Sequence, residues 1–380
     1  MEKKKLSIVD MFTIASGQFG CMVGGGVTSG TTLVLYYVSR GGIYAPFAAS
    51  VAILVLFLMY YLSVEIGRKY SIDSYDGLFK LVYGKASIML SPLADVSVLL
   101  TCYVCILAVF AGSGSYFNQM FGWPILAGAL GSAVICLFIT YKGLEFFSNA
   151  QGLMSIVMFG LLFSIYVVVI FYFGKDELAI KFATRWVPEG FSIGSVLWWT
   201  TMHCSGLISF VAVYMLQAKK FNTRKEILGT MGIGIVCNCV GIVLPIIALL
   251  CYAPQIFSLD VPALYLISDV VNFPAATLAY SLLLIFAWIT TGSACLVTIN
   301  ERLKRYIPQR ISHPKVHSAL LPLLICAVSV PLSLGGLLAV YSRWAPISAA
   351  LCVVMLFIPL VVRGPILLSK KRPGNDNQSA

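Results

Sequence analysis

Charged residues are scarce in this chain. Asp, Glu, Lys and Arg together make up 11% of its 380 residues, whereas hydrophobic residues make up 59% and the mean hydropathy is +0.91. Soluble globular domains carry about 25% charged residues. The composition therefore excludes an ordinary soluble protein and predicts a chain that lies almost entirely within a membrane.

The residues that carry most enzyme chemistry are also few. The chain has three histidines, two of which (His313 and His317) fall in a predicted loop, and no CxxC pair with partner ligands. We find no nucleophile–base pair, metal cluster, phosphate loop or pair of membrane acids. The eleven cysteines fall within apolar segments or at their ends, where they pack as small polarizable residues. We therefore predict no enzyme, no cofactor, no disulfide framework and no zinc site.

What the chain does have is long apolar runs. A transmembrane helix needs roughly 20 apolar residues. The sequence contains ten such runs, near 9–38, 43–66, 92–116, 123–141, 147–173, 191–216, 227–252, 274–300, 318–341 and 344–368. We predict an all-α polytopic membrane protein with ten transmembrane helices, one transmembrane domain over residues 1–380 and a disordered cytoplasmic tail at 369–380. We predict no cleavable leader and expect the first helix to be its own insertion signal.

The distribution of basic residues predicts the orientation. With the N-terminus in the cytoplasm, all but five of the 26 Lys and Arg residues fall on the cytoplasmic side. The five are Arg40, Lys175, Lys181, Arg185 and Arg343. This asymmetry follows the positive-inside rule, so we predict a multi-pass protein of the cell (inner) membrane with both termini cytoplasmic. The net charge of +11 then reflects topology and contact with anionic lipids, and no nucleic-acid partner is expected.

Glycine interrupts the first apolar run in its middle. Gly24, Gly25 and Gly26 lie at mid-depth and are followed by Thr28, Ser29 and Gly30. Glycine weakens a helix by about 1 kcal/mol per residue relative to alanine. Because hydrocarbon offers no hydrogen bonds, unwound backbone at that depth occurs where it lines a cavity. A broken spanning helix of this kind indicates a transporter's binding site.

The order of features indicates an inverted repeat. The external connection 174–190 divides the chain into two sets of five spans, 9–173 and 191–368, and an odd number inserts the second set upside down. Short amphipathic stretches, 74–84 and 261–271, follow the second and seventh spans. The sixth span also carries a polar and glycine cluster at mid-depth, like the first. This cluster consists of Thr200, Thr201, His203, Cys204, Ser205 and Gly206.

These features resemble the amino acid–polyamine–cation (APC) transporter superfamily, which has the five-plus-five inverted-repeat LeuT fold of the sodium-coupled leucine transporter. The segment Val23–Gly30 looks like the corresponding segment of YkvI-like bacterial membrane proteins. The resemblance implies discontinuous helices 1 and 6. It also implies secondary active transport by alternating access, in which a helix bundle rocks against a scaffold around one central site.

The resemblance also implies a sodium site. Its ligands would be the carbonyl groups of Gly20, Val23 and Ala287 and the hydroxyl groups of Thr290 and Thr291. The alternative is that the two threonines bond back to carbonyl groups four residues earlier. A second sodium site found in some relatives is not predicted, because the position of its asparagine is Val27 here.

His203 makes proton coupling an alternative to sodium coupling. As a titratable group at mid-depth it is a candidate carrier of a coupling proton. Two alternatives are a hydrogen bond to substrate and a structural bond to a neighbouring helix. The span 147–173 contains no Lys or Arg, the residue type that replaces sodium in some proton-coupled relatives. Sodium is therefore the favoured coupling ion and a proton the alternative.

The polar groups at mid-depth favour a small zwitterion as substrate. Free amide groups after Gly26 would receive a carboxylate, and carbonyl groups at a helix end near Cys204–Gly206 would receive an ammonium group. By resemblance, Tyr103 would contact the carboxylate and help close the outer side, the alternative being a packed aromatic residue. The predicted substrate-binding residues are Gly24, Gly25, Gly26, Thr28, Ser29, Tyr103, His203, Cys204, Ser205 and Gly206.

We therefore predict a sodium-coupled symporter of an amino acid or a similar zwitterion. Two other classes stay open. One is a transporter-fold sensor that binds an amino acid without turnover. The resemblance implies this class because it includes the spore germinant receptor subunits. The other is a ten-helix drug/metabolite exporter, which the long eighth span disfavours. Acidic residues near the span ends, such as Glu65 three residues before Arg68, are expected mainly as local ion pairs or solvated charges.

Overall fold

The described part of the chain is helical. The computed structural model describes residues 5–142, 144–215, 217–303 and 314–370, and no strand occurs among them. The first half contains α1 (Ile8–Met22), α2 (Gly25–Thr28), α3 (Thr31–Leu33), η1 (Val34–Val38), α4 (Ser39–Gly41), η2 (Gly42–Tyr44), α5 (Ala45–Tyr70), α6 (Tyr75–Tyr83), η3 (Gly84–Ala86), α7 (Ser87–Phe121), α8 (Ile125–Lys142), α9 (Leu144–Val168), η4 (Val169–Gly174) and α10 (Lys175–Ala183).

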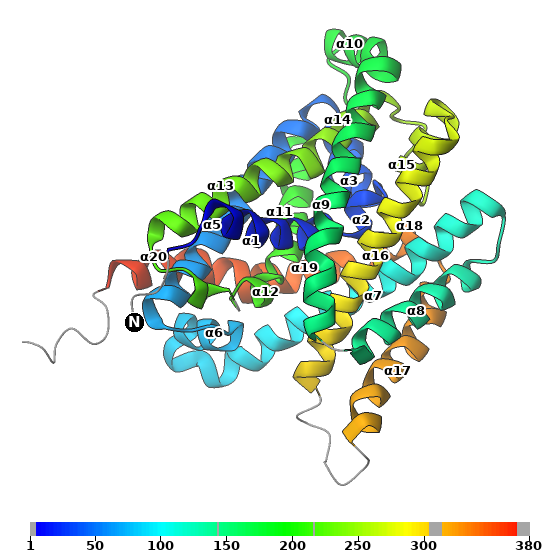
Figure 1. Cartoon of the computed structure of the whole chain (residues 1–380). Helices are drawn as coiled ribbons and strands as arrows, with labels where there is room; N and C mark the ends of the chain where they lie inside the picture. The colour runs from blue at the N-terminus through cyan, green and yellow to red at the C-terminus, as the bar shows by residue number, and fades with distance from the viewer. Residues whose placement is uncertain (1–4, 143, 216, 304–313, 371–380) are drawn as a thin grey trace, which may run out of the picture.

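The second half begins with another interrupted helix and is shown with the first in Figure 1. It contains α11 (Ile193–Ile208), α12 (Val211–Met215), η5 (Ala218–Lys220), α13 (Arg224–Asn238), η6 (Cys239–Val243), α14 (Leu244–Cys251), α15 (Pro262–Tyr265), η7 (Leu266–Val271), α16 (Pro274–Leu303), α17 (Pro314–Ser333), α18 (Leu337–Arg343), α19 (Ala345–Cys352), η10 (Val353–Phe357) and α20 (Ile358–Ser369).

Several helices have the length and composition of membrane spans. Among the described residues, six stretches qualify: Thr31–Tyr70, Tyr75–Phe121, Ser155–Ala183, Arg224–Cys251, Pro274–Asn300 and Leu337–Ser369. Their outer faces expose large apolar side chains, such as Val134 (64% exposed) and Phe138 (57% exposed) on α8. Apolar surface on this scale needs lipid rather than water around it. The chain is a multi-pass, all-helical membrane protein.

The predicted spans need correction at two places. The ninth was expected to run over 318–341, but α17 ends at Ser333, and after a turn at Gly336 (φ 87°) α18 begins the next stretch. Only glycine adopts this conformation readily, so the boundary lies in the Gly335–Gly336 pair. The third span is longer than predicted, because α7 runs unbroken for 35 residues. Most of the predicted tail lies outside the described residues, since the description ends at residue 370.

The short amphipathic stretch 74–84 is confirmed as a helix. Ser74 caps the start of α6, where its side chain accepts a hydrogen bond from the Gly77 amide, and Gly84 ends the helix with φ 59°. The predicted pair of Glu65 and Arg68 is also confirmed, with a shortest N–O distance of 2.6 Å. The stretch 261–271 is helical as well, divided between α15 and η7. Local sequence signals thus determine where α6 begins and ends.

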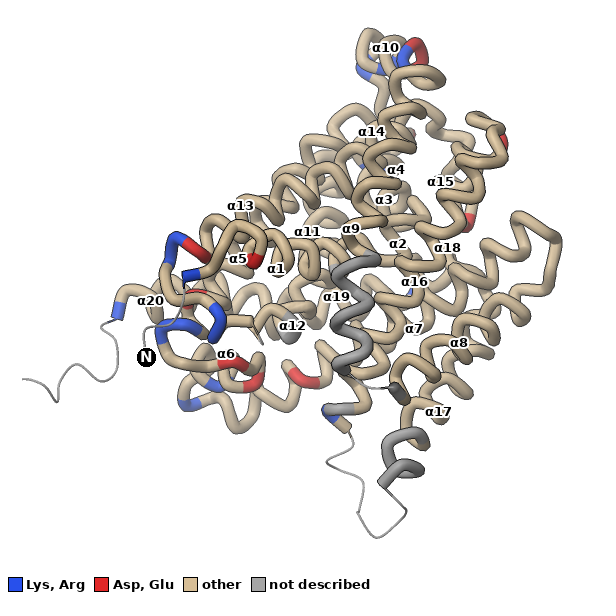
Figure 2. Tube along the Cα trace, in the orientation of Figure 1, with Lys and Arg blue, Asp and Glu red and all other residues tan. Residues whose placement is uncertain are grey.

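Charged residues gather at two opposite ends of the helices. Figure 2 shows one group around α6 and the ends of α5, α13 and α20, and another at α10. The N-terminal segment lies at the first end, where the Leu6 amide donates to the Glu226 carboxylate (3.1 Å). The end of α20 lies there too, because Lys69 donates to the carbonyl groups of Leu367 and Leu368. The first and last described residues therefore lie at the same end.

Five stretches of the described chain are π-helical: η1, η4, η6, η7 and η10. A π-turn contains one residue more than an α-turn and is often found at functional sites. The π-helix η1 follows α2 and α3, and the π-helix η10 directly follows α19. Both thus lie next to segments that line the cavity described below.

Candidate functional site

A cavity of about 90 Å³ lies between the broken first helix, α7, α11, α16 and the α18–α19 segment. A single water molecule needs about 10–15 Å³ measured in this way, so the space accommodates a small solute and not a drug-sized one. No Asp, Glu, Lys or Arg is among its lining residues. These are Met22, Gly24, Gly25, Gly26, Val27, Thr32, Tyr36, Thr101, Val104, Cys105, Met202, His203, Gly206, Leu207, Phe210, Thr291, Tyr341, Ala345, Ser348 and Ala349.

The glycine run lies against three polar-tipped side chains. A Cβ on Gly24 would lie 2.5 Å from Thr291 Oγ1, and one on Gly25 would overlap the Trp288 indole. A Cβ on Gly26 would overlap the hydroxyl group of Tyr341. The three glycines are thus required by close approach of α16 and α18 as well as by the break in the helix.

The half-helix after the glycine run is interrupted soon after it begins. It starts as α2, only four residues long, and after Gly30 in a left-handed conformation (φ 82°) it continues through α3, η1 and α4. Because so few peptide groups are aligned, the expected helix dipole is not built here. Thr28 and Ser29 do not line the cavity. Their hydroxyl groups donate to the carbonyl groups of α2, Thr28 to Gly24 (3.1 Å) and Ser29 to Gly26 (3.0 Å).

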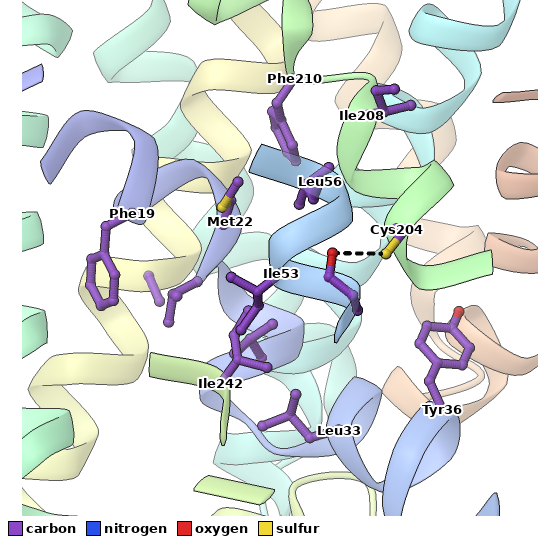
Figure 3. Packing of buried hydrophobic residues seen from close by; sticks show 14 of the residues in the cluster. Phe19, Met22, Leu33, Tyr36, Ile53, Leu56, Cys204, Ile208, Phe210 and Ile242 are labelled. Atoms are coloured by element: carbon purple, nitrogen blue, oxygen red, sulfur yellow. Dashed lines mark hydrogen bonds between the residues drawn. The ribbon is translucent and has the colours of Figure 1, made fainter. Parts of the chain in front are cut away.

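The sixth span breaks later than predicted. The helix α11 is continuous through Cys204, Ser205 and Gly206 and ends at Ile208, followed by a turn and α12. His203 and Gly206 line the cavity, whereas the Cys204 thiol donates to the Ala52 carbonyl (3.4 Å; Figure 3) and Ser205 is fully buried outside the lining. An α-helix with Gly206 inside it keeps its hydrogen bonds, which is why the polar cluster does not itself unwind the chain.

The carbonyl groups at this break already have donors. The Gly206 carbonyl accepts the hydroxyl group of Ser209 (2.7 Å), and the Leu207 carbonyl accepts that of Tyr60 (2.7 Å). The expected ammonium site near Cys204–Gly206 is therefore occupied by hydrogen bonds within the chain in this conformation.

His203 is held by the first span. Its Nδ1 is 2.8 Å from the Tyr37 hydroxyl group, and the ring lies 5.5 Å from that of Tyr36. The structural bond to a neighbouring helix is therefore present. Within the described residues Nε2 has no hydrogen-bond partner, and the side chain lines the cavity, so a bond to substrate is compatible with it. A charged imidazolium would be buried here with no acid among the lining residues, which is energetically unfavourable.

The predicted sodium ligands are only partly available. The Thr290 hydroxyl group donates to the carbonyl groups of Phe286 (2.8 Å) and Ala287 (3.1 Å), which is the back-bonding alternative. The Thr291 Oγ1 is buried, has no partner among the described residues and faces Gly24. The helices α1 and α16 pack together, with Val23 and Ala287 fully buried. The two halves of the predicted site are thus adjacent, and Thr291 joins them.

Tyr103 is not brought to the cavity. The helix α7 presents Thr101, Val104 and Cys105 to it, at the spacing of one helical face. Tyr103 is not among the lining residues and packs against the apolar cluster that contains Val104 and Leu337.

Sequence reasoning also missed residues of the last apolar stretch and of the segment after the glycine run. No sequence signal marks the first group, because its small residues are interspersed with Arg343, Trp344 and Ile347. The missed residues include Thr32, Tyr36, Tyr341, Ala345, Ser348 and Ala349.

Comparison with known proteins identifies the fold. No protein-family model and no curated protein sequence matches the chain. Among solved structures it is similar to MhsT in complex with L-phenylalanine, with TM-score 0.61 and 14% identity over 97% of this chain and 89% of that one. It is also similar to a Na⁺-coupled sialic acid symporter (TM-score 0.58, 16% identity, 94% of this chain and 77% of that one).

A third similar structure is Mhp1, a nucleobase-cation-symport-1 family transporter, with TM-score 0.51 and 14% identity over 94% of this chain and 77% of that one. The second and third of these structures are a symporter and a transporter. At these identities the comparison shows a common fold and not a common substrate. The chain therefore has a LeuT-like membrane transporter fold.

Proposed function

We propose that the protein is a secondary active transporter that couples sodium to the movement of a small amino-acid-like zwitterion. The observation that carries the proposal is the meeting of the broken first helix and Thr291 of α16 at the wall of a small, uncharged cavity. Broken helices around a central cavity are the usual substrate and ion sites of such transporters. The similar structures include a Na⁺-coupled symporter and a complex with L-phenylalanine, which supports both parts of the proposal.

The proposed architecture is one transporter domain over residues 1–380. It comprises ten membrane spans in two inverted sets, 9–173 and 191–368, with both termini in the cytoplasm of the cell membrane. The first and last described residues lie at one charged end (Figure 2), which supports the even number of spans. Within the fold, the glycine segment Val23–Gly30 favours placement beside the YkvI-like proteins.

The proposed sodium site consists of the carbonyl groups of Gly20, Val23 and Ala287 with the hydroxyl groups of Thr290 and Thr291. Thr291 contributes a buried hydroxyl group without a partner, whereas Thr290 would have to release its bonds to the preceding turn. We therefore assign the larger share of sodium binding to Thr291. Each sodium ion that enters gains about 2.3 kcal/mol per 100 mV of membrane potential.

The absence of an acid among the cavity-lining residues favours sodium over a proton on His203. In this proposal His203 stays neutral, is held by Tyr37 and donates or accepts one hydrogen bond with the substrate. His203→Ala is then expected to lower substrate affinity without changing the dependence of transport on sodium.

The decisive experiment measures uptake of radiolabelled amino acids into proteoliposomes that contain the purified protein, with and without an inward sodium gradient. Accumulation that requires sodium in the wild type, is lost in Thr291→Ala and is weakened less in Thr290→Ala supports the proposal. Accumulation driven by a pH gradient and lost only in His203→Ala contradicts sodium coupling. Binding of an amino acid, seen as increased thermal stability, with no accumulation under any gradient indicates a sensor.

A further inference from the structure

The polar end of the cavity is built around Tyr341. This residue lies on α18, lines the cavity and places its hydroxyl group against Gly26. The hydroxyl group makes no hydrogen bond to the described residues. Thr32 also contacts Gly26, and its Oγ1 is buried without a partner in a side chain that is 4% exposed. The Tyr341 hydroxyl group and the Thr32 methyl group therefore face Gly26, and both side chains line the cavity.

The groups gathered at this end are mainly hydrogen-bond donors. The backbone N–H groups of Gly25 and Gly26 belong to the first turn of α2 and have no intrahelical acceptor. The hydroxyl groups of Thr32, Thr291 and Tyr341 are each able to donate one bond. A buried donor without an acceptor is unfavourable by about 1–3 kcal/mol. A ligand group that accepts several bonds at once, as a carboxylate does, would satisfy this set.

The opposite end of the cavity is apolar. Met22, Leu207 and Phe210 line it, and Figure 3 shows Met22 and Phe210 well separated from Tyr36, which lies beside the polar end. Tyr36 belongs to the polar end because its hydroxyl group donates to the Tyr341 carbonyl (3.4 Å). The cavity thus has one end for a polar head and another for an apolar side chain.

We infer that Tyr341 binds the carboxylate of a small amino acid with an apolar side chain, in the place that resemblance gave to Tyr103. This inference rests on the proposed function and specifies its substrate class and one of its binding residues. Both tyrosines pack against the apolar cluster that contains Leu337, but only Tyr341 lines the cavity and reaches the glycine run.

The helix that carries Tyr341 is also anchored by Asp260. The Leu338 amide donates to the Asp260 carboxylate (2.9 Å), and the Ser115 hydroxyl group donates to the same carboxylate (2.8 Å). The Asp260 carbonyl in turn accepts the Thr31 hydroxyl group (2.5 Å). Asp260 therefore links α18 to α7 and to the segment that follows the glycine run.

The test compares Tyr341→Phe with the matched control Tyr103→Phe. Ligand affinity is measured by the shift in thermal stability and by isothermal titration with the standard L-amino acids. The tightest ligand is then compared with its carboxamide, which keeps the ammonium group and side chain and lacks the carboxylate. We expect Tyr341→Phe to weaken the amino acid by about 10- to 100-fold, as for a hydrogen bond to a charged group, and to change the carboxamide by less than about twofold. Tyr103→Phe is expected to change neither.

Thr32→Val serves as a second variant, because it removes the neighbouring hydroxyl group at constant shape and should weaken the amino acid but not the carboxamide. Equal losses for acid and carboxamide, or a loss in Tyr103→Phe but not in Tyr341→Phe, would overturn the inference while leaving transport intact. A wild-type protein that binds no amino acid would overturn both the inference and the proposed substrate. Unliganded melting temperatures establish that each variant is folded.

Discussion

Gly25→Ala is expected to destabilise the protein by about 2 kcal/mol. The new methyl group would overlap the Trp288 indole, which is only 2% exposed. The indole has little room to move, because it is buried and also packs closely on Gly112, where a Cβ would come within 2.8 Å of Nε1. The upper end of the range of about 1–3 kcal/mol for overpacking therefore applies. The better helix propensity of alanine offsets about 1 kcal/mol of it.

The measurement is the change in the free energy of unfolding of the purified protein in detergent, from denaturant titration, supported by the apparent melting temperature. Gly160→Ala in α9 is the matched control, since a Cβ there would meet nothing within 4 Å. It is expected to leave stability unchanged or to raise it by up to about 1 kcal/mol. The difference between the two variants isolates the contact with the indole from the general effect of replacing glycine.

A double-mutant cycle with Trp288→Phe tests the stated cause. The smaller ring leaves space for the methyl group and removes an indole N–H that has no partner among the described residues. Gly25→Ala should then be at least 0.5 kcal/mol less destabilising in the Trp288→Phe background, the lower limit of the usual coupling between contacting residues. An unchanged effect in that background would refute the reasoning, as would a Gly25→Ala protein as stable as the wild type.

Three further predictions concern the two ends of the molecule. Asp95→Asn removes the negative charge of a carboxylate that accepts hydrogen bonds from both Nε and Nη2 of Arg302. The free energy of unfolding should fall by about 1.5–3 kcal/mol. No change would mean that solvent replaces the ion pair of Asp95 and Arg302. Asp260→Ala removes the anchor of α18, so labelling of Cys105 by a membrane-impermeant thiol reagent should increase, and a Cys105→Ser control should abolish the increase. Glu226→Ala removes the acceptor of three backbone N–H groups. The start of α13 and the N-terminal segment should therefore become more sensitive to limited proteolysis. Unchanged cleavage would contradict a role of Glu226 in holding these segments.

The broken first helix and the short helix 74–84 could be predicted because their causes are local. Consecutive glycines weaken a helix wherever they occur, and the Ser74 cap and Gly84 end act within a few residues. The contact between the glycine run and Thr291 could be predicted from the family resemblance, which implies that these two distant segments form one sodium site. The sequence alone contains no signal for that pairing.

The choice of cavity residues could not be predicted in the same way. Successive residues of an α-helix differ in direction by about 100°, so whether Tyr103 or its neighbours Val104 and Cys105 face the cavity depends on how α7 is rotated in the bundle. That rotation is decided by packing against other helices. The role of Tyr341 likewise depends on the turn at Gly336, which separates α18 from α17 and directs it over Gly26.

The π-helical turns determine how the chain tolerates a change in its length. Each holds one residue more than an α-turn, so loss of one residue within η10 restores an ordinary helix while α19 and α20 keep the directions of their side chains. The same loss within α7, which is α-helical for 35 residues, would turn every residue beyond it by about 100°. Single-residue gaps between this protein and its homologues are therefore expected at the five π-turns, which makes them markers for aligning distant sequences.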